Sequence, residues 1–412
     1  MDSDLASVIS LPNGADAELR RSLKLRDGEP MRVTFIPGPG DVAGTFDHWR
    51  VQRHEPRVPT IAYSLMFYEL MSRLGAECQI IALHPIGASA RSAGSQFRFE
   101  HVTQLPASDR WSYLRSQRLY ARDLISMVER YDPHIVVTST HNPSAAWQRL
   151  SKGRKLILTA HNSFWPMGRP PRGVKSRIRK ARLASQARAL DAAICTSHEC
   201  ARQISEVTGG RLQGEVQCPQ VVERYPIETR TRARQLLFLG RIEQSKGVFL
   251  LLDVFDRLAA HHPDLSLVLA GSGTAEAALG YRLTTSPHRD RISFLGRVGS
   301  EGVHSAIAAA DLLVCPTMTT FNEGLAVVGF EAAAHGIPTV LSSVVPARDL
   351  LGESCTVYEA DDANALHQAL SGLIESPETY RDKCRATAAV RDKIYDRSLS
   401  WGSGLFRALM RA

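Results

Sequence analysis

The sequence has few cysteines and no long hydrophobic run. Seven cysteines are spread over 412 residues, and no two have the two-residue spacing of a zinc or redox site. A structural zinc site and a disulfide framework are therefore excluded, and we expect reduced thiols in a cytoplasmic protein. No run approaches the roughly 18 apolar residues of a membrane-spanning helix. Residues 1–30 mix both charges and lack the apolar core of a secretory signal, so we expect a loose, flexible leader.

Acidic side chains are outnumbered, with 42 Asp and Glu against 50 Lys and Arg, which gives a net charge of +8. Eight of the cations lie between Arg169 and Arg188, where there is no acidic residue. Val174, Ile178 and Ala181 form an apolar stripe within this stretch, which fits either a solvated helix packed by its stripe or a helix docked on anionic lipid. A nucleic-acid-binding protein is a weaker alternative, because no known module is visible and aromatics do not interleave the cations.

Short β-branched runs alternate with longer helical patterns along the whole chain. Strands are expected at 31–36, 78–83, 134–138, 155–159 and 192–195, and again at 235–239, 265–270, 292–295, 312–315, 338–341 and 356–358. The helices between them indicate βαβ units and parallel sheets. A polar, proline-containing linker near 222–234 separates the two series. We therefore expect an α/β protein with two doubly wound, Rossmann-like domains, at 31–225 and 226–399, and a ligand in the cleft between them.

Two motifs of the second half carry candidate chemistry. Gly240-Arg241 and Lys246 follow the first strand of that half and precede a helix N-terminus, where a guanidinium and an ammonium suit a diphosphate. Glu323 and Glu331 are eight positions apart, a little over two helical turns, so we expect them on one face of a helix over 324–335. Their surroundings are apolar, and sugar or ribose hydroxyls would be suitable partners for such carboxylates.

The first half offers a glycine-rich turn and two histidines. Gly38 and Gly40 follow the first strand, but their spacing is not the Gly-x-Gly-x-x-Gly of dinucleotide enzymes, which disfavours a nicotinamide cofactor. His141 and His161 each follow a strand, where a side chain can reach the cleft. The segment from Pro37 to Pro59 is rich in charged residues, and we expect a long loop that shapes an acceptor pocket.

The pairing of Gly-Arg-x4-Lys-Gly with Glu-x7-Glu and a following Ala-x-x-x-Gly-x-Pro resembles the retaining glycosyltransferases of family 4, which have the GT-B fold. The resemblance implies that Arg241 and Lys246 bind the diphosphate of a UDP- or GDP-linked sugar, that Glu323 contacts the sugar and that Glu331 holds the ribose. His161 would reach the donor sugar, so that the implied catalytic residues are His161, Glu323, Arg241 and Lys246. The remaining implied donor-binding residues are Gly38, Gly40, Gly240, Gly271, Arg297, Val298, Gly324, Leu325 and Ala326, with the N–H groups of the last two opening the helix.

The same resemblance implies transfer to a hydroxyl acceptor with retention, no cofactor and no metal, in cell-surface polysaccharide or glycolipid synthesis. The acceptor would be lipid-linked, and the protein cytoplasmic or peripheral on the inner face of the membrane through residues 169–188. A helix over 400–412 would pack back on the first domain. One departure is Glu323-Gly-Leu-Ala326 in place of the family's Glu-Gly-Phe-Gly. Alternatives are a GT-B epimerase or hydrolase of nucleotide-sugars and a catalytically silent binding protein.

Overall fold

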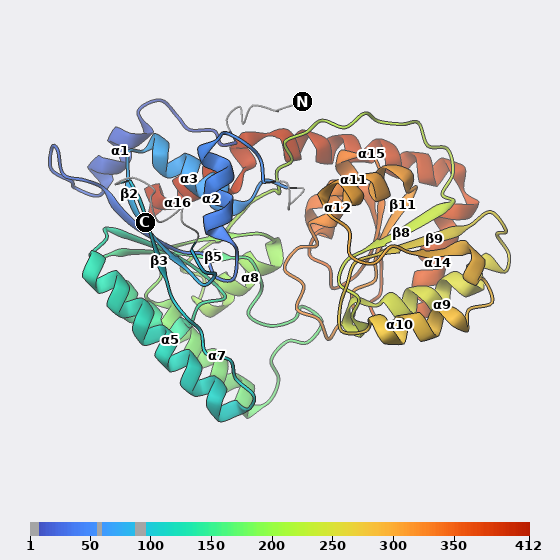
Figure 1. Cartoon of the computed structure of the whole chain (residues 1–412), viewed down its shortest axis with the longest axis horizontal. Helices are drawn as coiled ribbons and strands as arrows, with labels where there is room; N and C mark the ends of the chain where they lie inside the picture. Colours follow the sequence, from blue (N-terminus) through green and yellow to red (C-terminus); the bar gives the residue numbers. More distant parts are fainter. Residues whose placement is uncertain (1–7, 56–59, 87–95) are drawn as a thin grey trace.

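Short hydrophobic runs form two parallel sheets in the computed structural model, which describes residues 8–55, 60–86 and 96–412 (Figure 1). The seven-stranded sheet has the order β3-β2-β1-β4-β5-β6-β7, and the six-stranded sheet has the order β10-β9-β8-β11-β12-β13. Each order reverses beside the first strand of its sheet, which is the topology of a doubly wound sheet. The expected fold, two Rossmann-like α/β units, is confirmed.

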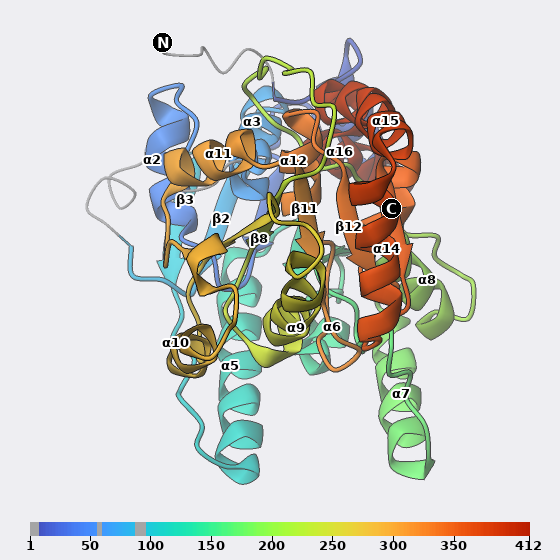
Figure 2. The ribbon, with the colours of Figure 1, turned by 90° about the vertical axis from the view of Figure 1, so that its right-hand side faces the viewer.

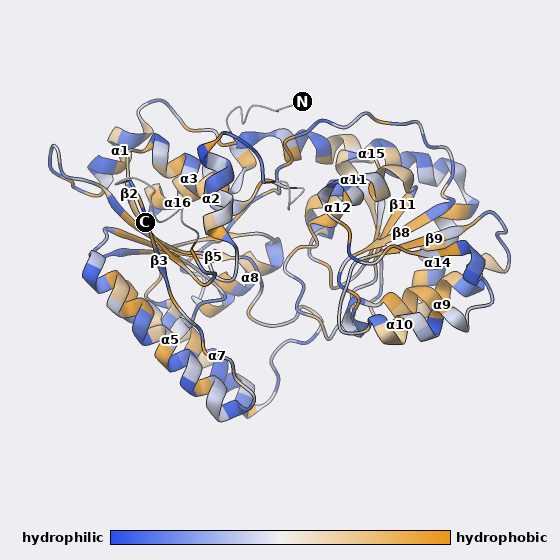
Figure 3. Cartoon of the chain, in the orientation of Figure 1, coloured by the Kyte–Doolittle hydropathy of each residue, from blue (hydrophilic) through white to orange (hydrophobic). Residues whose placement is uncertain are grey.

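The strands are short and mostly buried. The first sheet contains β1 (Arg32–Ile36), β2 (Glu77–Ala82), β3 (Phe97–His101), β4 (Ile135–Ser139), β5 (Lys155–Ala160), β6 (Ala192–Cys195) and β7 (Glu215–Val216). The second contains β8 (Gln235–Leu239), β9 (Ser266–Ala270), β10 (Ile292–Phe294), β11 (Leu312–Cys315), β12 (Thr339–Ser342) and β13 (Cys355–Tyr358). Figure 3 shows these strands as largely hydrophobic, as expected for parallel sheets that are covered on both faces.

Helices cover both faces of each sheet (Figures 1 and 2). The first unit carries α2 (Val42–Arg50), α3 (Tyr63–Arg73), α5 (Arg110–Tyr131), α6 (Trp147–Leu150), α7 (Val174–Ala187) and α8 (His198–Val207). The second carries α9 (Val248–Ala259), α10 (Glu276–Thr284), α11 (Ser300–Ala309), α12 (Val328–Ala334), α13 (Arg348–Leu351), α14 (Ala363–Glu375) and α15 (Pro377–Tyr395). No helix of the described residues is long and apolar enough to cross a membrane.

The C-terminal helix α16 (Trp401–Arg411) returns to the first unit, where it packs on α3 and β6. Trp401 is fully buried beside Phe35, with ring centroids 6.2 Å apart. The linker runs alongside this crossing, because Cys218 N–H donates to the Leu399 carbonyl at 3.1 Å. The two units are thus joined by two neighbouring chain crossings. The exact domain bounds, 31–225 and 226–399, stay a prediction.

The prediction of a loose leader is wrong for residues 8–30. These residues contain α1 (Ala15–Ser22), whose Leu19 is completely buried in the core of the first unit. Ile9 lies against α16, and the Ser10 N–H donates to Ser403 Oγ at 2.8 Å. The physical reason is that the apolar side chains of this mixed-charge segment find a surface on α16, which is distant in sequence. Residues 1–7 lie outside the described part.

The segment expected to be a long loop after Pro37 contains a helix, α2. Asp41 caps α2 by accepting a hydrogen bond from the Gly44 N–H at 2.9 Å. The apolar face of α2 packs on α3, where Phe46 and Tyr68 rings meet edge to face. The loop prediction is therefore wrong for residues 42–50, and residues 56–59 lie outside the described part.

Candidate active site

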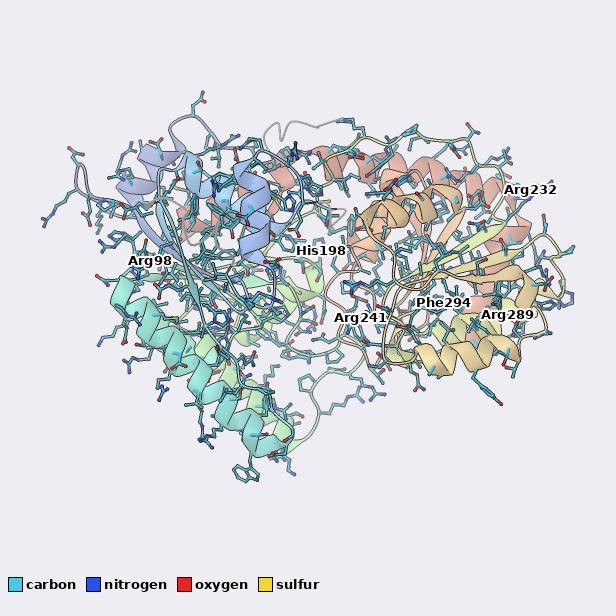
Figure 4. The ribbon with its side chains drawn as sticks, in the orientation of Figure 1. Arg98, His198, Arg232, Arg241, Arg289 and Phe294 are labelled. Atoms are coloured by element: carbon cyan, nitrogen blue, oxygen red, sulfur yellow. The ribbon has the colours of Figure 1, made fainter. Side chains whose placement is uncertain are left out.

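The carboxyl ends of both sheets border one cavity of about 710 Å³. The first unit contributes residues that follow β1 and β5, among them Pro37, Gly40 and His161. The second unit contributes Arg241, which lies where the two units face each other in Figure 4, and Lys246. Ligands of doubly wound sheets bind at this edge, beside the point where the strand order reverses.

The cavity brings together most, but not all, of the predicted site residues. Nine line it: Gly40, His161, Gly240, Arg241, Lys246, Glu323, Gly324, Leu325 and Ala326. Five are not among its lining residues: Gly38, Gly271, Arg297, Val298 and Glu331. Gly271 has a clear packing role, because its φ is +137° and an added Cβ would lie 1.8 Å from the Gly240 carbonyl oxygen. The donor-binding roles of all these residues stay predictions.

The two predicted cations are held by carboxylates of the same unit. Lys246 Nζ lies 2.5 Å from Glu323 Oε2, and both side chains are largely buried. Thr317 Oγ1 donates to the same carboxylate oxygen at 3.2 Å. Arg241 is more exposed and pairs with Glu243 at 2.7 Å. Lys246 and Glu323, which sequence analysis placed on separate motifs, thus form one charged pair at the cavity wall.

The expected helix over 324–335 begins later than predicted. Helix α12 starts at Val328, so Glu323 to Val327 form a loop, and Ala326 has a left-handed φ of +67°. The prediction that the Leu325 and Ala326 N–H groups open the helix is therefore wrong. The physical reason is the left-handed turn, which interrupts the helical backbone before Val327.

Glu331 lies on α12, where it is only 7% exposed. No described residue gives its carboxyl group a hydrogen bond or an ion pair, and burial raises the pKa of this group to about 7. A carboxylate in such a place is stabilised only when a partner with hydroxyl or N–H groups reaches it. The prediction of a solvent-remote glutamate that needs partners agrees with this environment.

His161 follows β5 and packs against Tyr63, with ring centroids 4.6 Å apart and the ring planes tilted by 33°. Burial lowers its pKa to about 4, and neighbouring His141 adds to this effect, so the ring is neutral at physiological pH. Thr159 Oγ1 donates to the Thr138 carbonyl at 3.3 Å and lies 3.2 Å from His161 Nε2. The hydroxyl therefore accepts from Nε2–H, which leaves Nδ1 as an acceptor without a partner among the described residues.

The two units touch each other beside the cavity. Asn322 Nδ2 donates to the Ser163 carbonyl at 2.7 Å, and Ser163 Oγ donates to Asn322 Oδ1 at 2.6 Å. Gly324 faces His161 so closely that an added Cβ would lie 2.2 Å from the His161 carbonyl oxygen. The loop that carries Glu323 therefore forms part of the contact between the units.

Sequence analysis missed several residues of this site. Tyr63 lines the cavity from the first unit and had no predicted role. Asp41 and Glu55 line it as well; both lie in the 37–59 segment that was expected to shape a pocket, and the capping position of Asp41 ahead of an apolar helical pattern was a signal for its individual role. Asn322 and Phe321 precede Glu323, but no local pattern shows their contacts. Among the described residues, no three His, Cys, Asp or Glu side chains converge as a metal site requires, and metal independence stays a prediction.

Family models cover most of both units. One, described as glycosyl transferases group 1, matches residues 223–390, and one described as glycosyltransferase family 4 matches residues 63–213. The chain belongs to glycosyltransferase family 4. The expected resemblance is therefore confirmed, because each half of the chain matches one of the two models.

Among the relatives of this family 4 chain is the phosphatidyl-myo-inositol mannosyltransferase of Mycolicibacterium smegmatis, 30% identical over 182 residues, which are 43% of this chain and 45% of the relative. A GDP-mannose-dependent phosphatidylinositol monomannoside mannosyltransferase of Corynebacterium glutamicum is 31% identical over 149 residues, 34% of this chain and 37% of the relative. The chain thus spans less than half the length of each of these relatives.

Solved structures share the fold over nearly the whole chain. The sucrose-phosphate synthase of Thermosynechococcus elongatus has a TM-score of 0.67 at 16% identity, with 92% of this chain and 98% of that chain covered. Anabaena HepE in complex with UDP has a TM-score of 0.61 at 15% identity, covering 90% and 97%. At these identities the likeness shows the GT-B fold of the family 4 chain.

Proposed function

We propose that the protein is a retaining glycosyltransferase that moves a sugar from a UDP- or GDP-linked donor to a hydroxyl group of a lipid-linked acceptor. One observation carries the proposal: Arg241, Lys246, Glu323 and His161 line a single cavity between the units. Two cations, a carboxylate and a neutral imidazole are what a diphosphate with an attached sugar would need around it. The mannosyltransferase relatives support this class of reaction.

The donor would lie across the face of the second unit. Its diphosphate oxygens would replace Glu243 and Glu323 as the partners of Arg241 and Lys246. Glu323, released from Lys246, could then accept hydrogen bonds from sugar hydroxyls. Glu331 would accept hydrogen bonds from the ribose, which would provide the partners that this buried carboxylate lacks within the described chain. His161 lines the cavity on the other side, where its neutral ring would lie against the donor sugar.

The chemistry proposed is substitution at the anomeric carbon. The bond between that carbon and the diphosphate oxygen breaks, the acceptor oxygen bonds to the carbon from the same face, and the acceptor proton passes to the departing diphosphate. Arg241 and Lys246 would stabilise the charge that develops on the leaving group. Glu323 would keep the hydrogen bond from Thr317 when Lys246 turns to the diphosphate, which suits a positioning role rather than that of a nucleophile.

The proposed place of action is an anionic membrane surface, on the inner face of the membrane. Figures 1 and 2 show α5 and α7 projecting from the first unit, with their ends level. Their N-terminal turns are the exposed ends, since Trp111 is 81% and Val174 72% exposed, whereas Val128 and Ala187 near the other ends are buried.

Charge supports the same surface. Residues 110–122 hold four arginines and residues 169–188 eight cations, with no acidic residue in either range. These twelve exceed the net charge of +8, so the rest of the chain carries a net −4. Exposed aromatic and aliphatic side chains among cations suit the interface of an anionic bilayer and agree with a lipid-linked acceptor in glycolipid or cell-surface polysaccharide synthesis.

Thermal unfolding with UDP, GDP, ADP, NAD⁺ and a short single-stranded RNA tests the donor. We expect one nucleoside diphosphate to stabilise the protein by about 2.7 kcal/mol at a hundred times its Kd. The effect should be lost in Arg241→Ala and Glu331→Ala but kept in Arg232→Ala, which removes an exposed cation at the far edge of the second unit (Figure 4). Stabilisation by RNA alone would contradict the proposal.

The reaction type needs a second measurement. With the identified nucleotide-sugar, turnover should require a hydroxyl acceptor, and the product should keep the donor's anomeric configuration by NMR. Turnover without an acceptor would favour an epimerase or hydrolase instead.

Flotation with vesicles tests the surface. We expect binding to anionic vesicles that falls with salt and no binding to neutral ones. Trp111→Ala should weaken it, whereas Tyr281→Ala, which removes a 75% exposed ring of α10, should not. Equal behaviour of the two variants would contradict the proposed surface.

A further inference from the structure

The Phe321 ring contacts both cations of the candidate site. Its ring centroid is 4.1 Å from Lys246 Nζ and 5.0 Å from Arg241 Cζ. Both distances are within the range at which the negative face of an aromatic ring attracts a cation. Sequence analysis gave this residue no role.

Both cations lie within 5.0 Å of the same ring centroid, so their like charges are near enough to repel and need compensation. Glu243 and Glu323 each compensate one of them, at 2.7 and 2.5 Å. A diphosphate that recruits the cations would compete with these carboxylates. The ring of Phe321 is uncharged, so it can keep attracting both cations while their anionic partners change.

The backbone around Phe321 is fixed on the loop that carries Lys246. The Met318 N–H donates to the Ser245 carbonyl at 2.9 Å. Gly247, which follows Lys246, lies so close to the segment before Phe321 that an added Cβ would be 1.8 Å from the Pro316 carbonyl oxygen. The ring is therefore held at a defined place relative to both cationic side chains.

We infer that Phe321 is a positioning residue that holds the Arg241 guanidinium and the Lys246 ammonium at the spacing required by a nucleoside diphosphate, and so sets the preference for diphosphate over monophosphate. The inference rests on the proposed function, since it names the residue that orders the proposed diphosphate site. Phe321 itself would not touch the reacting atoms.

Calorimetric titration with UDP, GDP, UMP and GMP tests this role. In Phe321→Leu we expect binding of whichever diphosphate the wild type prefers to weaken about tenfold, or ~1.4 kcal/mol, with the matching monophosphate little changed. Phe321→Tyr retains the aromatic face and should bind as the wild type does. Tyr281→Leu, which changes an exposed ring on α10, is the matched control.

The ratio of the two affinities separates positioning from folding. Equal loss for diphosphate and monophosphate in Phe321→Leu, no loss at all, or a Phe321→Tyr variant as weak as Phe321→Leu would each overturn the inference. A wild type that binds neither diphosphate would overturn the proposed function, and the inference with it. A wild type that binds one normally while Phe321→Leu is unaffected would overturn the inference alone.

Discussion

Because Glu331 is buried, we expect the free energy of unfolding to fall as the pH rises. Its side chain is 7% exposed, and burial raises its pKa from 4.5 to about 7. Below pH 4.5 the carboxyl is protonated in the folded and the unfolded chain, so it has no effect on the difference between them. Between pH 4.5 and 7 the unfolded chain loses this proton first, and the free energy of unfolding therefore decreases, by about 3 kcal/mol in total.

The substitution Glu331→Gln removes this titration. From pH 4.5 to pH 8 we expect the unfolding free energy of the variant to rise, relative to wild type, by about 3 kcal/mol. Any constant contribution of the amide cancels, because only the change with pH is compared. Urea denaturation followed by circular dichroism at several pH values measures this difference.

The matched control is Glu301→Gln, which alters an exposed glutamate of α11. Its difference from wild type should not vary over the same pH range. If the difference for Glu331→Gln is also constant, the Glu331 carboxyl is not destabilised by burial and the reasoning is refuted. In the proposed function, the same carboxyl accepts ribose hydroxyls in its ionised form, so diphosphate binding near pH 7 should release protons in the wild type and fewer in Glu331→Gln.

Three further predictions concern the contact between the units and the N-terminal segment. Gly324→Ala places a methyl group 2.2 Å from a carbonyl oxygen across the cavity, and we expect sugar transfer to fall about 100-fold, whereas Gly280→Ala on α10, where a Cβ meets nothing within 4 Å, should have no effect. Ser163→Ala and Asn322→Ala should show a coupling of about 1 kcal/mol in a double-mutant cycle of diphosphate binding, and additive effects would deny their link across the cavity. Leu19→Ala should destabilise the fold by about 3 kcal/mol in urea denaturation, and a loss under about 0.5 kcal/mol would restore the interpretation of a loose leader.

Sequence predicted the central strands of both sheets closely. The strands at 192–195, 235–239 and 312–315 have the predicted bounds, because a short apolar run with a buried interior differs clearly from its polar flanks. The fully buried strands β4 and β12 begin one residue later than predicted. Strand β3 was missed since it lies at the edge of its sheet and only Phe97 is fully buried. Its apolar residues Phe97 and Phe99 alternate with polar ones, which is the pattern of a half-buried strand, whereas the strands that were predicted are continuous apolar runs.

The site was predictable only as far as its motifs are local. Arg241 and Lys246 could be placed after a strand because their own neighbours show the turn. The contact between Ser163 and Asn322 joins residues 159 positions apart, and neither has a pattern around it that indicates a partner. The same holds for Leu19, which is buried in a core that also contains residues of α16 at the other end of the chain.

The two glutamates show how a correct motif was given the wrong geometry. Their eight-position separation was interpreted as two helical turns on one face, but only the part from Val328 onward is helical. The first part is a loop in which Ala326 has a φ of +67°, a conformation that costs an L-residue with a Cβ about 1–2 kcal/mol. Glycine, which the family usually has at this position, adopts it without that penalty. The spacing between Glu323 at the cavity and buried Glu331 is therefore set by a left-handed turn followed by one helical turn. The left-handed φ at this position explains why the family's pattern has a glycine there. In this chain Ala326 adopts the same conformation, and the Glu323 loop lies against His161.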